Sequence, residues 1–76
     1  MATVRISDAT LLELLLADLT ARPDVVAEVS GPDTLRLSLL GSYNEGAMRL
    51  AILLRIRAWE AAQRARGIEV EVDIDY

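Results

Sequence analysis

The chain ends in the sequence IEVEVDIDY, in which apolar and acidic side chains alternate. The apolar positions are Ile68, Val70, Val72 and Ile74, and the acidic positions are Glu69, Glu71, Asp73 and Asp75. Because successive side chains of a β-strand point to opposite faces, this alternation predicts a strand with one buried and one solvated face. Such a strand needs neighbouring strands and an apolar covering layer, which the rest of the chain must supply.

Three other segments also have the pattern of strands. Residues 3–7 alternate, and residues 24–30 and 34–40 flank the turn-forming sequence GPDT, which predicts a β-hairpin. In the second hairpin strand the expected inward positions are Leu35, Leu37 and Leu39, and the outward ones are Arg36 and Ser38. If residues 3–7 only lead into the next segment, the sheet has three strands instead of four.

Two segments have the periodicity of helices. Residues 7–23 carry leucines over a broad arc of the helical wheel, with Ser7 or Asp8 as the N-cap and Pro23 as the terminator. A longer helix then runs to about Arg66, where Gly67 is suited to a left-handed helix end.

The start of this longer helix has two candidate caps. Ser42 followed by Glu45 fits a capping box, and Asn44 is the alternative. The order of elements is then β-α-β-β-α-β. It predicts one small α+β domain over residues 1–76, a ferredoxin-like sandwich with a four-stranded antiparallel sheet and two helices on one face.

The composition argues against most chemistry. The chain has no cysteine, histidine or lysine, so disulfides, thiolate and imidazole metal sites and the common nucleophile–base pairs have no residues to form them. We therefore expect no catalytic residues, no metal and no cofactor, and a protein that is not an enzyme.

The net charge of −4 and the pI near 4.6 disfavour binding to phosphate backbones, so no nucleic-acid partner is expected. No apolar run approaches the roughly 20 residues of a membrane span, and the start has no signal-peptide pattern, which predicts a cytoplasmic protein without a membrane partner. All eight basic residues are arginine, which suggests a GC-rich bacterial genome.

The longer helix has two apolar faces. The face expected to pack on the sheet consists mostly of small residues, namely Ala47, Leu50, Ala51, Leu54, Ala58, Ala61, Ala62 and Ala65. A second, bulkier stripe supplies the interface candidates Met48, Ile52, Ile56 and Trp59. One apolar stripe suffices for a surface helix, so the second predicts either a contact with the neighbouring helix or a protein interface. Glu45–Arg49 and Glu60–Arg64 have the spacing of exposed ion pairs.

The four acidic residues of the last strand are the candidates for an acidic surface. Carboxylates spread along an extended strand do not converge on a cation, and an exposed strand offers no cleft for acid catalysis. The simplest interpretation is an edge strand whose charges discourage further pairing, with Arg5 of the neighbouring strand close by. Docking of a basic partner is the alternative.

The segments ARPDV, GPDTLRLSLLGS and EGAMRLAI resemble bacterial BON domains, in which a helix, a β-hairpin and a second helix precede a last strand. The resemblance covers about half of the chain, and the second helix is much longer here. It carries no function over, because ferredoxin-like topology hosts many unrelated activities.

These observations favour a non-enzymatic protein–protein interaction or oligomerisation module, a homodimer or an adaptor domain of a larger bacterial assembly. Such a small domain gains stability from a partner. Two alternatives stay open: an ACT-like regulatory domain that binds a small molecule, and an acidic inhibitor that docks on a basic protein.

Overall fold

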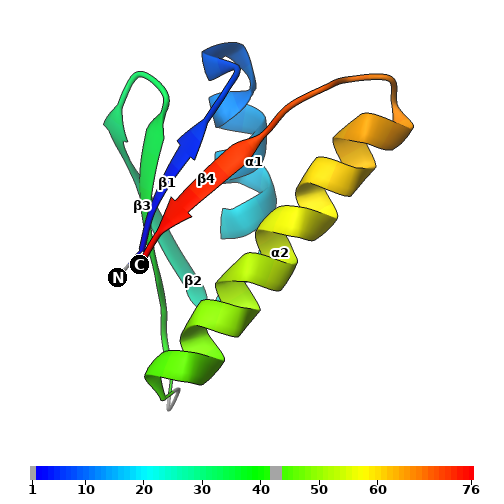
Figure 1. Cartoon of the computed structure of the whole chain (residues 1–76). Helices are drawn as coiled ribbons and strands as arrows, with labels where there is room; N and C mark the ends of the chain where they lie inside the picture. Colours follow the sequence, from blue (N-terminus) through cyan, green and yellow to red (C-terminus); the bar gives the residue numbers. More distant parts are fainter. Residues whose placement is uncertain (1, 42–43) are drawn as a thin grey trace.

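The computed structural model describes residues 2–41 and 44–76 and has the predicted β-α-β-β-α-β order (Figure 1). The elements are β1 (Ala2–Ile6), a 3₁₀ turn η1 (Ala9–Leu11), α1 (Leu12–Thr20), β2 (Val25–Gly31), β3 (Thr34–Leu39), α2 (Glu45–Ala65) and β4 (Val72–Asp75). The sheet order is β2-β3-β1-β4, and each neighbouring pair is antiparallel. The ferredoxin-like topology is therefore confirmed, and the three-stranded alternative is wrong because residues 2–6 form β1.

One face of the sheet is buried and the other is open. In β1, Ala2, Val4 and Ile6 are buried while Thr3 and Arg5 are exposed. The buried face joins one hydrophobic core with Leu12, Leu15 and Leu19 of α1 and with Ile52, Ile56 and Trp59 of α2. Both helices therefore cover the same face, as the alternation in the strands predicts.

Local hydrogen bonds explain where the helices begin. Asp8 Oδ1 accepts from the Thr10 amide at 3.0 Å and so caps η1, which leads into α1. At α2, Asn44 Oδ1 accepts from the Ala47 amide at 2.7 Å, which confirms the alternative cap. The predicted capping box depends on Ser42, which lies outside the described residues.

The C-terminal end of α2 has the geometry that Gly67 predicts. Gly67 has φ 82°, its amide donates to Arg64 O, and the amide of Ile68 donates to Gln63 O, both at 3.0 Å. This pair of bonds is the Schellman motif, which needs a left-handed residue after the helix.

The last strand is shorter than predicted. Residues 68–75 were expected to form it, whereas β4 spans Val72–Asp75. The pairing partner is the reason, since β1 ends at Ile6 and Ile6 lies opposite Val72. Beyond that point only Glu71 continues the ladder, by exchanging hydrogen bonds with the amide and hydroxyl of Ser7.

Within the part of the chain that the structure describes, no helix is long and apolar enough to cross a membrane.

Candidate interaction surface

The structure places the two apolar faces of α2 the opposite way round from the prediction. Ile52 and Ile56 are fully buried, Trp59 is 4% exposed, and Met48 packs against the same core. Three of these side chains are core residues and Met48 is half-buried against them, so the interface predicted at Met48, Ile52, Ile56 and Trp59 is wrong. Their observed role is to hold α2 on the sheet.

The volume of the side chains explains which face of α2 packs on the sheet. Side chains must fill the space between a helix and the sheet beneath it to the density of a protein interior. Isoleucine and tryptophan reach the leucines and valines of the sheet, whereas an alanine face would leave voids and bury less apolar area. The bulkier stripe therefore packs inward, and the small-residue face turns outward.

The outward face of α2 is apolar as well. Leu50 and Leu54, both in the first half of this helix of 21 residues, are 56% and 60% exposed. We call this face the outer stripe and define it by Ala47, Leu50, Ala51, Leu54, Ala58, Ala61 and Ala65, of which Ala51 is half-buried and also packs against the core. A surface helix needs one apolar stripe only, so charged residues would be expected on this face.

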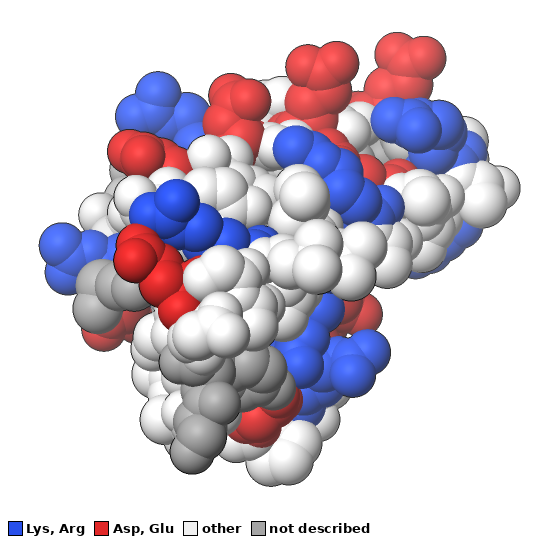
Figure 2. All heavy atoms as spheres, turned by 60° about the horizontal axis from the view of Figure 1, so that its bottom comes forward, with Lys and Arg blue, Asp and Glu red and all other residues white. Residues whose placement is uncertain are grey.

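Arginines lie on both sides of the outer stripe. At 100° per residue, Arg57 and Arg64 follow one border of the stripe, and Arg55 and Arg66 follow the other. Figure 2 shows a band of uncharged surface between arginine side chains, with several carboxylates along the upper edge of the view and others beside arginine side chains. The surface is thus locally basic, although the chain is acidic overall.

Only two of these four arginines are held by ion pairs. Arg55 donates to both carboxylate oxygens of Asp24, at 2.9 and 3.4 Å, and Arg57 pairs with Glu60 at 2.6 Å. For Arg64 and Arg66 no carboxylate of the described residues lies within ion-pair distance. Their guanidinium groups remain available for an incoming carboxylate.

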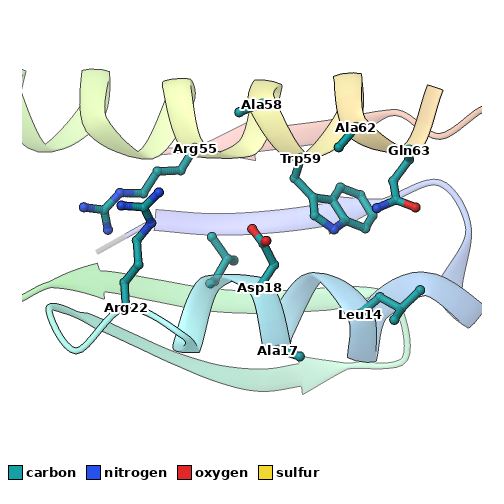
Figure 3. A pocket seen from close by; sticks show the side chains of 10 residues that line it. Leu14, Ala17, Asp18, Arg22, Arg55, Ala58, Trp59, Ala62 and Gln63 are labelled. Carbon is teal, nitrogen blue, oxygen red and sulfur yellow. The ribbon is translucent and has the colours of Figure 1, made fainter. Parts of the chain in front are cut away.

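A groove of about 500 Å³ lies between α1 and α2 and borders the outer stripe (Figure 3). Trp59 and Leu14 lie along it, and Arg22 and Arg55 stand at one end. Ala58 belongs both to this groove and to the outer stripe, so the two surfaces are adjacent.

Gln63 lies at the other end of the groove, beside Trp59 (Figure 3). Its side-chain oxygen Oε1 is buried without a hydrogen-bond partner. In Figure 3 this oxygen points away from the middle of the groove, so it is an unpaired atom of the interior and offers no contact to a ligand in the groove.

Glu60 differs from its predicted role. We expected a solvated pair with Arg64, whereas Glu60 is 7% exposed and bonds to Arg57 and to the amide of Val72. The carboxylate is buried because it accepts a hydrogen bond from the amide of Val72, which points away from β1 and has no strand partner. The other predicted pair, Glu45–Arg49, is confirmed at 2.6 Å.

The four acidic candidates of the last segment, Glu69, Glu71, Asp73 and Asp75, are all exposed. Asp73 lies opposite Arg5 in the β1–β4 register, which confirms the expected neighbour, although Arg5 approaches Asp33 at 4.0 Å. Within residues 2–41 and 44–76 no group of three acidic residues is placed to hold a metal ion. Docking of a basic partner on this row stays a prediction.

Comparisons with protein-family models, with curated proteins and with solved structures give no match to this chain. Its candidate surface is therefore argued from geometry alone. Sequence reasoning found both apolar faces of α2 but assigned them wrongly. The bulk of their side chains was the signal that would have separated them.

Proposed function

We propose that this domain is a non-enzymatic protein-interaction module that binds an α-helix of a different protein on the outer stripe of α2. The observation that carries the proposal is the exposure of Leu50 and Leu54 on a helix whose opposite face already fills the core. A helix that is apolar on both faces is typical of one that is covered on both sides.

The spacing of small residues supports a helix as the occupant. Residues 47, 51, 54, 58, 61 and 65 are separated alternately by four and three positions, and all are alanine except Leu54. This is the spacing of a coiled-coil seam, and alanines let a second helix approach closely. The seam extends for about 27 Å along α2, which matches about five turns of a partner helix.

The flanking charges support a partner other than a second copy. If two α2 helices packed on each other, the arginine borders would face arginine borders, and like charges across an interface oppose binding. A helix with Asp or Glu beside its apolar seam would instead pair with Arg64 and Arg66. The expected partner is thus an amphipathic helix with acidic flanks, as an adaptor domain would recognise.

The test is a single charge in the middle of the stripe. Leu54→Glu should abolish binding, because it buries a carboxylate among alanines. Leu40→Glu is the matched control, since Leu40 is also 56% exposed but follows β3 and is not one of the residues of the outer stripe. The immobilised domain would first capture the partner from cells of the source organism. Titration calorimetry with the purified partner would then compare the two variants.

The arginines beside the outer stripe allow a second test of the same complex. Reversal of both Arg64 and Arg66 to Glu should weaken the same complex at least tenfold, and salt should weaken the wild-type complex. An unchanged affinity of the Leu54→Glu domain, or an equal loss for Leu40→Glu, would contradict the proposal.

A further inference from the structure

The two edges of the sheet are built differently. At the β4 edge, the outward amide of Val72 donates to Glu60 and its outward carbonyl accepts from Arg57, at 2.9 and 3.0 Å. At Val72, two side chains of α2 thus take the place of a neighbouring strand, whereas no hydrogen bond of the described chain involves the outward groups of Ile74. The acidic row of β4 adds charge repulsion, which is a common protection of edge strands.

The β2 edge lacks these two protections, and its one irregularity is a register shift between Val29 and Gly31, at the end of the strand. The amide of Leu40 donates to Asp24 O at 2.8 Å, and Val26 and Glu28 lie opposite Ser38 and Arg36. Since backbone groups alternate in direction along a strand, Val26 and Glu28 bond to β3 while the groups of Val25, Ala27 and Val29 point outward.

Among the described residues, one of these outward groups is occupied, the amide of Val25, which donates to Arg22 O at 3.2 Å. No hydrogen bond of the described chain involves the outward groups of Ala27 and Val29. The β2 edge therefore presents unpaired donors and acceptors between Val25 and Val29.

The side chains of β2 do not discourage pairing either. Val26 and Val29 are 48% and 54% exposed. Glu28 is the one charged residue of the strand, and Arg36 of β3 lies 3.8 Å from it. Proline occurs only outside the strand, at positions 23 and 32. An edge with a single charged residue, which a neighbouring arginine offsets, and with exposed valines is a template for another strand.

We infer that β2 pairs antiparallel with β2 of a second copy of this chain, which joins the two sheets into one of eight strands. A two-fold axis at Ala27 lets each Ala27 amide donate to the other Ala27 carbonyl, and each Val29 amide donate to the other Val25 carbonyl. This register places Glu28 opposite Val26, whereas an axis at Glu28 would place two carboxylates opposite each other.

The charge distribution supports a second copy as the occupant. In the joined sheet the two acidic β4 strands lie at opposite ends, about 34 Å apart at about 4.8 Å per strand spacing. This distance is several times the Debye length of about 8 Å, so two chains of net charge −4 meet without opposing their acidic rows. Pairing also adds buried surface to a small domain.

This inference does not depend on the outer stripe. α1 packs over β2, whereas α2 packs towards β4 and reaches the start of β2 through the Arg55–Asp24 ion pair. The outer stripe itself lies on the face of α2 that is turned away from the sheet. A dimer through β2 therefore leaves both outer stripes free for partner helices.

Ala27→Pro is the most direct test, because proline removes the outward amide while edge strands tolerate it. Sedimentation equilibrium over a range of concentrations should show a dimer for the wild-type chain and at least tenfold weaker dimerisation for Ala27→Pro. Leu54→Glu should leave the dimer unchanged. Circular dichroism tests whether each variant is folded. If Ala27→Pro is unfolded, Val29→Lys serves as a second variant of the β2 edge.

Hydrogen exchange of the wild-type chain gives an independent readout. The amides of Ala27 and Val29 should be protected at high concentration and lose protection on dilution, whereas the amide of Val26 stays protected because it bonds to β3. A monomer at millimolar concentration would overturn the inference. So would a dimer that survives Ala27→Pro but dissociates in Leu54→Glu, which would place the second copy on α2.

Discussion

The carboxylate of Glu60 accepts a hydrogen bond at 2.9 Å from the backbone amide of Val72, the first residue of β4. The guanidinium of Arg57 bonds both to this carboxylate and to the carbonyl of Val72. One helix thus satisfies both outward backbone groups of an edge residue. This contact joins α2 to β4 at the first residue of the edge strand.

Removal of this contact should be costly. Glu60→Ala leaves the amide of Val72 without its partner at a buried position, and the loss of a hydrogen bond to a charged group costs about 1.5–3 kcal/mol. Urea denaturation followed by circular dichroism measures the free energy of unfolding. The matched control is Glu45→Ala, whose ion pair with Arg49 is exposed and should contribute less than about 0.5 kcal/mol. Equal effects of the two substitutions would contradict the role of Glu60.

Trp59 should report on folding. Trp59→Ala removes a side chain that is almost fully buried and should lower the free energy of unfolding by about 3–5 kcal/mol. Tryptophan fluorescence of the native protein should be shielded from iodide. Leu54→Ala, on the exposed side of the same helix, should change stability by less than about 0.5 kcal/mol. Ready quenching of the native fluorescence would instead place Trp59 at the surface.

The sequence predicts the order and topology of the elements because these depend on local patterns. Alternation marks β1 and β3, GPDT marks the hairpin, and Asn44 and Gly67 mark the ends of α2. The length of β4 was not predictable from its own alternation. The strand begins at Val72 because Val72 lies opposite Ile6, the last residue of β1.

The facing of α2 shows a second limit of sequence patterns. The positions of apolar residues on a helical wheel show how wide the apolar arc of a helix is. In α2 this arc is so wide that it does not indicate which half packs on the sheet. The choice depends on the volume between the layers, which is a property of the assembled fold. The burial of Glu60 and Gln63 has the same origin, because it depends on what the neighbouring segments place beside them.

Gln63 offers a stabilising substitution. Its buried Oε1 lacks a hydrogen-bond partner, and an unpaired polar atom in the interior costs about 1–3 kcal/mol. Gln63→Met keeps the length of the side chain and removes the polar amide, so it should raise the free energy of unfolding by about 1 kcal/mol. Thermal unfolding would measure this gain. A loss of stability would show that the amide makes a favourable contact, for instance with the ring of Trp59.

Substitution by alanine should change the free energy of unfolding in opposite directions at Gly46 and Gly67, which lie near the two ends of α2. Gly67 has φ 82° and nothing within 4 Å of an added Cβ, so Gly67→Ala should lose about 1 kcal/mol from the left-handed backbone alone. Gly46 lies in the first turn of α2, where an added Cβ would stand 3.6 Å from Asn44 Oδ1, an ordinary contact. Gly46→Ala should therefore gain about 0.5–1 kcal/mol by restricting the unfolded chain. Both changes are read from the same urea titration. Because the two variants add the same methyl group, a shift of the same sign in both would refute the assignment of Gly67 as a left-handed helix end.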